Sequence, residues 1–440
     1  MNSMKKVSAV IPLILFICLA DIFPVSTACA QDEIRFSELV ISNDFPAGLT
    51  IQITATSPDQ QIVGAEIAYS RASLYSPESY TVEEIEITPG SQVTLEYRLD
   101  TEDLTTPPMM SYLYHWELRL ADGTDFISET YSVQYTDIRY NWQVLDNDLV
   151  AVWWHDKPAA FGQAVFDIAG EAVRQQSELF QADLNQQIQV VINNDSEEFA
   201  SWHNLSYDWV GGETYTDYGI TVQIVTSRDP EDGWLYGVIP HEISHIFFDQ
   251  VTYNPTVSIP VWLNEGVAQF NEFTSQEWSS QQVKDAARSG NLIQLNKLAN
   301  GFGAHDTNRV YLAYAESLSA VNYLVETYGT EGLLALLTGY RDGNRTDEAF
   351  EQALGISPSQ FELDWAASLD AAGYQISTPP PMPTFPPSPT PGAGSFSGAT
   401  PVPQQEPADL DRKLPICSSL FGLLGFSLIT VWKKRNSSLL

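Results

Sequence analysis

The sequence predicts a multidomain α+β protein: an N-terminal all-β sandwich, an α+β domain, a proline-rich stalk and one C-terminal transmembrane helix. Three observations indicate this order. Before about Val144, short runs alternate between apolar and polar residues, as in strands. After it, longer stretches repeat apolar residues with the period of a helix. A proline-rich segment begins near Ser377, and the uncharged run Leu414–Trp432 follows it. With 44% hydrophobic and 12% aromatic residues among 440, the chain can bury substantial cores.

Residues 1–30 have the features of a secretory signal peptide. Two lysines precede the apolar run Val10–Ala20, and the small residues of A-C-A stand just before Gln31, which we expect to begin the mature chain. An uncleaved N-terminal anchor is the alternative. Acylation of Cys29, as in a lipoprotein, is less favoured because the residue three positions earlier is serine rather than aliphatic.

Residues 31–143 are predicted to form the sandwich, of the immunoglobulin or fibronectin kind. Short alternating runs are separated by turn signals such as P-G at 89–90 and D-G at 122–123. No catalytic constellation occurs there, so a spacer or adhesion module is the simplest interpretation. The clearest runs are Leu49–Thr56, Ile62–Tyr69, Val93–Leu99 and Tyr112–Leu120.

Residues 144–374 are predicted to form an α+β domain in which a sheet packs on a helical half. Strands come first in this segment, and helices dominate from Leu235 to about Ala372. The expected strands are Leu149–Trp154, Gln187–Ile192 and an edge-like Gly219–Val225, and the expected amphipathic helix is Ala159–Phe180.

One motif in this domain carries chemistry, the H-E-x-x-H run at 241–245. On a helix, His241 and His245 project from one face about one turn apart, so both imidazoles can reach one Zn²⁺. Glu242 lies beside them and is the expected general base, taking a proton from a metal-activated water. The alternative is a polar stripe on a surface helix, which the apolar neighbours disfavour.

A third ligand is expected at Glu265. It follows His245 with 19 residues between, enough for one helix to end and a second to return antiparallel, and N-P and I-P pairs supply the break. Two histidines and a glutamate form an established catalytic zinc set that leaves one position for water. The sequence therefore predicts a zinc site.

These segments resemble the gluzincin metallopeptidases, the clan of thermolysin and the aminopeptidase N-like enzymes. The His-to-Glu gap is similar to thermolysin's, and W-L-N-E-G-V-A at 262–268 resembles the aminopeptidase N group. The resemblance implies zinc ligation by His241, His245 and Glu265. It also implies that Glu272, expected on the same helix face as Glu265, supports the metal ligands, and that Tyr314 stabilises the oxyanion. For Glu272 a solvated helix position, and for Tyr314 an ordinary packed aromatic, are the alternatives.

The sequence departs from these families in three places. The G-x-M-E-N segment that grips a free amine in aminopeptidases is absent, so a typical aminopeptidase is not expected. Gln269 stands where thermolysin has an acid. Pro240 directly precedes the motif and fits best in the first turn of the helix or at a kink; a helix broken there would make the motif a coincidence.

The C-terminal region is predicted to anchor the protein. Residues 375–413 are predicted to form a semi-rigid proline-rich linker. Residues 414–432 would span roughly 28 Å as a helix, enough for a bilayer core. The basic run K-K-R opens the tail at 433–440 and places it in the cytoplasm. A buried C-terminal helix is the alternative, disfavoured by the prolines before it.

Charge and cysteine usage limit the function classes. Net charge is −35, and residues 31–432, with 16 basic and 55 acidic residues, reach −39, which excludes nucleic acid as an expected partner. The three cysteines lie at the two ends, so no disulfide framework or thiolate zinc site is expected between them. An exported domain of this size without cysteine is typical of a protein on a prokaryotic cell surface.

Two functions follow from these observations. The first is a single-pass, membrane-anchored zinc metallopeptidase whose catalytic domain is extracellular and whose substrates are peptides or proteins. The second is an adhesion or binding protein whose zinc domain is inactive or structural. The intact set of base, ligands and oxyanion donor favours the enzyme.

Overall fold

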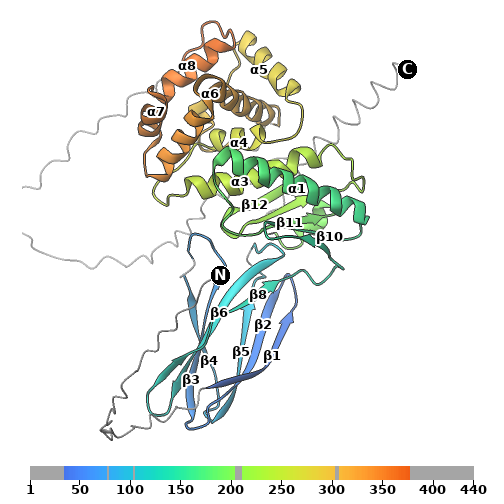
Figure 1. The fold of residues 1–440 in the computed structure, drawn as a ribbon, viewed down its shortest axis with the longest axis vertical. Coiled ribbons are helices and arrows are strands. Elements are labelled where there is room, and N and C mark those ends of the chain that lie inside the picture. Colours follow the sequence, from blue (N-terminus) through green and yellow to red (C-terminus); the bar gives the residue numbers. More distant parts are fainter. Residues whose placement is uncertain (1–33, 77–78, 103–104, 204–210, 303–306, 377–440) are drawn as a thin grey trace, which may run out of the picture.

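The computed structural model describes residues 34–76, 79–102, 105–203, 211–302 and 307–376. A β-rich N-terminal body stands below a mixed body of sheet and helices (Figure 1). The predicted signal peptide, most of the linker, the transmembrane segment and the cytoplasmic tail lie outside the described residues. Within the described part of the chain, none of the helices is long and apolar enough to cross a membrane.

The N-terminal body consists of two antiparallel sheets that share one buried core. Along Met110–Leu120, buried residues such as Tyr114 and Trp116 alternate with mostly half-buried ones, as the two faces of a strand require. One sheet contains β1 (Arg35–Asn43), β2 (Gly48–Thr56) and β5 (Gln92–Asp100). The other contains β4 (Thr81–Ile85), β3 (Ile62–Arg71), β6 (Met110–Leu120), β7 (Asp125–Ile127) and β8 (Tyr131–Tyr135), the last paired with β6. The immunoglobulin or fibronectin assignment stays a prediction.

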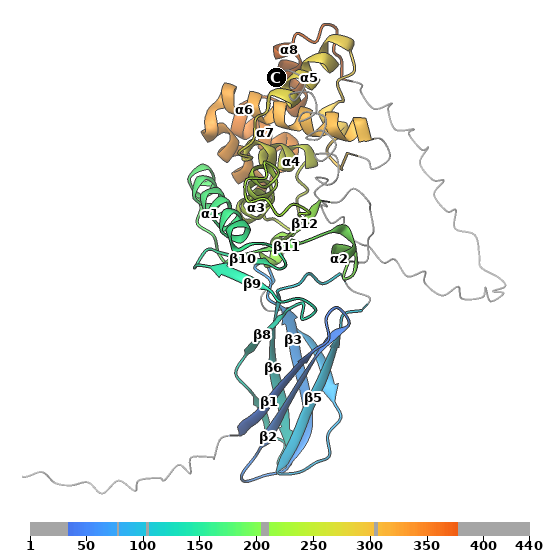
Figure 2. The ribbon, with the colours of Figure 1, turned by 90° about the vertical axis from the view of Figure 1, so that its right-hand side faces the viewer.

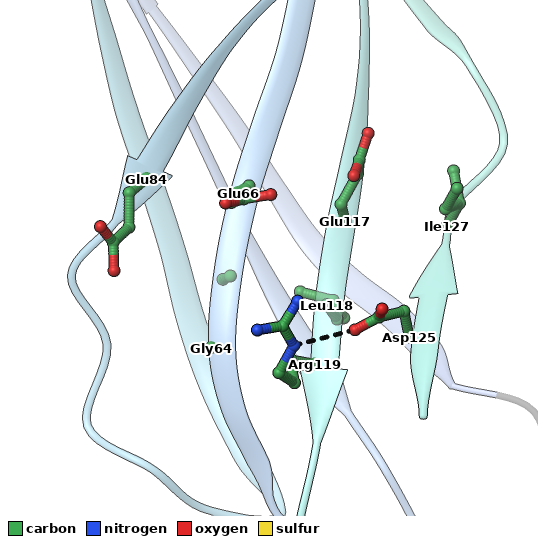
Figure 3. A pocket seen from close by; sticks show the side chains of 9 residues that line it. Gly64, Glu66, Glu84, Glu117, Leu118, Arg119, Asp125 and Ile127 are labelled. Carbon is green, nitrogen blue, oxygen red and sulfur yellow. Dashed lines mark hydrogen bonds and ion pairs between the residues drawn. The ribbon is translucent and has the colours of Figure 1, made fainter. Parts of the chain in front are cut away.

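The outer face of the second sheet carries a row of carboxylates. Glu66 lies between Glu84 on β4 and Glu117 on β6 and pairs with both in the strand register (Figure 3). Arg119 and Asp125 form an ion pair with 3.0 Å between Nε and Oδ1 at the end of the row. Like charges opposite one another destabilise a sheet, so this face tolerates its glutamates only because they are open to water.

The loop after β3 packs against the second body. The ring of Tyr75 stacks on that of Tyr253, with centroids 3.8 Å apart and planes 7° apart. The Leu74 N–H donates to the Asp217 carbonyl at 3.0 Å. Tyr253 directly follows α3 (Leu235–Thr252), the helix that carries the H-E-x-x-H motif. The sandwich is therefore in direct contact with the end of that helix.

The second body is built on a five-stranded mixed sheet. Its strands are β12 (Gly212–Tyr215), β13 (Ile220–Ile224), β11 (Ile188–Asn193), β10 (Val150–Trp154) and β9 (Gln143–Asp146), in that spatial order. The three central strands are parallel, and the two outer ones run antiparallel to their neighbours. The prediction that Gly219–Val225 is edge-like was wrong, because β12 covers β13 and forms the edge itself.

Helices α1 (Ala159–Phe180) and α3 pack on this sheet and on each other (Figure 2). The α1 bounds match the predicted amphipathic helix, and its apolar face joins β10 and β11 in one core. The remaining helices form the upper half of the body. They are α4 (Val261–Phe270), α5 (Glu277–Ser289), α6 (Thr307–Arg341, interrupted at Gly329), α7 (Thr346–Leu354) and α8 (Pro358–Ser368), and the short α2 (Ser196–Ala200) lies lower, after β11.

Close contact between α4 and α6 depends on Gly266. A Cβ atom there would lie 2.5 Å from the Ser317 carbonyl oxygen and 2.7 Å from Val321 Cγ2. We expect Gly266→Ala to lower the free energy of unfolding by about 1–3 kcal/mol, because α6 must move away. Gly170→Ala is the matched control in α1, where a new Cβ meets nothing within 4 Å.

The control should raise the free energy of unfolding by about 0.5–1 kcal/mol through helix propensity. Urea unfolding of the two variants and the wild type measures both effects. Equal stability of the two alanine variants would show that the helices do not meet closely at Gly266.

Two buried glutamates hold the segment after α5 against the helical half. Glu316 on α6 accepts from Ile293 N–H at 3.0 and 3.1 Å, and Glu362 on α8 accepts from Leu295 N–H at 3.1 Å. Burial raises the pKa of Glu316 from 4.5 to about 8, despite that backbone hydrogen bond. Glu316 is therefore protonated in the folded protein at neutral pH.

This shift predicts a pH dependence of stability. Between pH 4.5 and 8 the folded state keeps a proton on Glu316 that the unfolded state has lost. Glu316 therefore makes the free energy of unfolding fall as pH rises, by up to about 1.4 kcal/mol per pH unit. Glu316→Gln should flatten that slope in urea titrations across this range. Parallel curves for variant and wild type would contradict the assignment.

Candidate metal centre

Helix α3 presents both motif histidines on one buried face. His241 is 0% and His245 4% exposed, and almost the whole helix is enclosed between the sheet, α1 and α4. The two imidazole centroids are 4.9 Å apart with nearly perpendicular planes. The i, i+4 spacing therefore places the rings at one point beneath α4, as the sequence predicts.

Glu265 on α4 completes a three-sided arrangement. Its Oε2 lies 3.4 Å from His241 Nε2 and 3.8 Å from His245 Nε2. The three ligand atoms all lie within 4.8 Å of one another, and no other such group of His, Cys, Asp and Glu occurs among the described residues. Ligands about 2.0–2.1 Å from a tetrahedral ion stand about 3.4 Å apart, so these residues fit a metal ion such as zinc.

Each histidine is oriented through its other ring nitrogen. His241 Nδ1 lies 3.1 Å from Glu272 Oε1, and His245 Nδ1 lies 2.9 Å from Asn264 Oδ1. Both partners are acceptors, so each Nδ1 carries a hydrogen and a metal would bind through the Nε2 lone pair, taking the place of any proton there. The Nε2 atom of His245 is buried and makes no hydrogen bond to any described residue.

Asn264 was not predicted from the sequence. Its position directly before Glu265 was a signal, because the two side chains leave the helix on adjacent faces and can both approach α3. Asn271 adds a further bridge between these helices, donating to Ser244 Oγ at 2.9 Å.

Glu272 contacts His241 from a different element of structure than the sequence predicts. Helix α4 ends at Phe270, so Glu272 lies in the turn after it and not on the helix face that carries Glu265. The next residue, Phe273, donates its N–H to the Tyr236 carbonyl in α3 at 2.9 Å. That bond holds the turn close to His241.

Pro240 explains why the Tyr236 carbonyl is available. In a regular helix this carbonyl would accept from the N–H of residue 240, which proline lacks. Pro240 lies inside α3 and not in its first turn, and its own carbonyl accepts from Gln176 Nε2 of α1 at 2.8 Å. The proline thus exposes a backbone acceptor that ties Glu272 to the site, and the helix continues past it.

The excess of carboxylates at the site favours binding of a cation. Burial lowers the pKa of His241, but hydrogen bonds to Glu265 and Glu272 and the nearby charge of Glu242 outweigh it and raise the pKa to about 10. Three carboxylates around two imidazoles therefore favour a bound positive charge. A divalent ion would supply that charge in place of a proton.

The expected general base is fully buried beside the ligands. Glu242 is 0% exposed, and its Oε2 accepts a hydrogen bond from Thr214 Oγ1 at 2.5 Å. Thr214 belongs to edge strand β12, which sequence patterns missed because it is short and begins with glycine. The edge strand therefore contacts the base directly.

Tyr314 lies in α6, and its ring meets Phe302 edge-on with centroids 4.8 Å apart. It is 5% exposed and belongs to the core that α6 shares with α4. Its contribution to oxyanion stabilisation stays a prediction.

Comparison with known proteins adds one family match. Residues 168–371, which are 204 of the 440, match the family model described as the Peptidase MA superfamily. No curated protein matches the chain.

Solved structures give weaker likenesses. An aminopeptidase N family protein from Idiomarina loihiensis is 10% identical, with 76% of each chain covered and a TM-score of 0.38. OgpA from Akkermansia muciniphila is 12% identical, with a TM-score of 0.19, and the match covers 23% of this chain and 27% of that one.

The contact between Glu272 and His241 predicts an effect on metal affinity. Glu272→Ala should weaken zinc binding about 10–100-fold, because His241 loses the acceptor that orients it. Competition with a chromogenic chelator measures the affinity. Glu326→Ala, at an exposed position of α6, is the matched control and should bind as the wild type does. Unchanged affinity in the Glu272 variant would contradict an orienting role.

Proposed function

Because residues 168–371 have a gluzincin-like peptidase MA fold, we propose that this protein is a zinc-dependent peptidase. The observation that carries the proposal is the buried convergence of His241, His245 and Glu265, with Glu242 next to them on α3. Peptides or proteins are the proposed substrates.

The residues divide the chemistry between them. His241, His245 and Glu265 would hold the ion, which when bound would polarise the scissile carbonyl and acidify the attacking water. Glu242 would take the proton from that water and pass it to the leaving amine. Tyr314 is the proposed donor to the developing oxyanion.

The edge strand supports a specificity other than that of a typical aminopeptidase. The one carboxylate of β12 is Glu213, which is 1% exposed. Its Oε2 lies 2.5 Å from His203 Nε2 and accepts from the Tyr215 hydroxyl at 2.8 Å. These contacts hold Glu213 on the side of the strand opposite Thr214, which faces the base, so it is not placed to bind a substrate amine there.

We also propose that the peptidase is displayed at a prokaryotic cell surface. Residues 1–30 would direct export, and 414–432 would anchor the chain in the membrane, with 433–440 in the cytoplasm. The basic residues at both ends and the cysteine-free interior support this placement.

Glu242→Gln separates metal binding from chemistry. Purified full-length wild type and variant should each contain about one zinc per chain, because Glu242 is not a ligand. Only the wild type should cleave peptides from a mixed library, since the amide cannot accept the proton of water. Mass spectrometry of the metal and of the library products provides both measurements.

Removal and return of the metal complete this test. A chelator should abolish cleavage by the wild type, and added Zn²⁺ should restore it. Absence of zinc from both proteins would overturn the metallopeptidase proposal. Zinc without cleavage by the wild type would favour the binding protein with an inactive zinc domain.

A further inference from the structure

We propose that Thr214 is a positioning residue that holds the carboxylate of Glu242 through a polar ladder formed by Thr214, Thr221 and Gln223. The proposal rests on the proposed function, in which Glu242 is the general base. The ladder joins edge strand β12 to its neighbour β13 and ends on the helix that carries the base.

The strand register places the ladder. Thr214 pairs with Thr221 across β12 and β13, and Gly212 pairs with Gln223. Because side chains alternate along a strand, these four positions lie on one face of the sheet edge. Thr214 contacts Glu242, so this is the face toward α3.

The hydrogen bonds of the ladder run in one direction. Gln223 Nε2 donates to Thr221 Oγ1 at 2.5 Å, the two threonine hydroxyls lie 3.0 Å apart, and Thr214 Oγ1 lies 2.5 Å from Glu242 Oε2. The Thr214 hydroxyl lies within hydrogen-bond distance of both Thr221 and Glu242 but has one proton. With Glu242 as the general base, Thr214 gives that proton to Glu242, and the Thr221 hydroxyl, which accepts from Gln223, donates to Thr214.

Burial strengthens the hold of the ladder on the carboxylate. Glu242 and Gln223 are 0% exposed and Thr221 is 1% exposed. A hydrogen bond to an ionised acceptor in such a setting is stronger than a neutral one in water. Thr214 engages Oε2 and so restrains the position of that carboxylate oxygen beside the ligands.

Two further residues show that the ladder is specified by the sequence. A Cβ on Gly212 would lie 2.3 Å from Gln223 Oε1, so only glycine leaves space for Gln223. Glu213 projects to the opposite side, where it contacts His203 and Tyr215. A slip of one residue would bring Glu213 against Glu242, and like charges oppose that register.

Thr214→Val and Thr214→Ser test the proposal in the full-length, zinc-loaded protein. Valine keeps the shape of the side chain but removes the donor, and serine keeps the donor. We expect valine to lower kcat about 10–100-fold with KM and zinc content close to wild type, and serine to restore most of kcat. Thr252→Val is the matched control, a buried α3 threonine whose hydroxyl donates to the Phe248 carbonyl, and its kcat should not change.

Crystal structures of the same proteins give a readout that needs no activity. The Glu242 carboxylate should contact residue 214 in the wild type and the serine variant and should change its rotamer in the valine variant. An unchanged Glu242 position in the valine variant, or equal kcat losses for serine and valine, would overturn the proposal. If the wild type cleaves no peptide, the proposed function fails, and the crystal structures still decide whether Thr214 holds Glu242.

Discussion

The structure depends on the burial of charged groups that only a cation can balance. His241 and Glu242 on α3 and Glu265 on α4 are at most 2% exposed and lie where the two helices pack together. An unbalanced ionised carboxylate in such surroundings carries a large desolvation cost. Two imidazoles and a carboxylate aimed at one point remove that cost when they share a divalent ion. The same residues would then serve both the folding of the domain and its chemistry.

The surrounding elements position those groups through backbone effects as much as through side chains. Gly266 lets α4 approach α6, which places the neighbouring Glu265 against α3. Pro240 removes one helical hydrogen bond and so provides the Tyr236 carbonyl that anchors the turn carrying Glu272. Pro240, a residue type that usually interrupts helices, is therefore part of what completes the site.

The sequence predicted the parts of the site that depend on local spacing. The i, i+4 histidines and the separation of Glu265 from His245 follow from helix geometry, and α1 matched its predicted bounds because its amphipathic period is long. Contacts set by tertiary register were not predicted. Thr214 depends on how β12 pairs with β13, which are joined through a single 3-10 turn at Thr216–Tyr218. Glu272 was assigned to a helix that ends two residues earlier, and helix ends are the least certain feature of a sequence pattern.

The most direct test of the central claim is an anomalous diffraction map recorded at the zinc absorption edge from crystals of the protein grown with zinc. We predict one strong peak bounded by His241 Nε2, His245 Nε2 and the Glu265 carboxylate, at about 2.0–2.2 Å from each. A map with no peak at that point, or with zinc bound only elsewhere, would contradict the account of a buried site built to hold a metal ion.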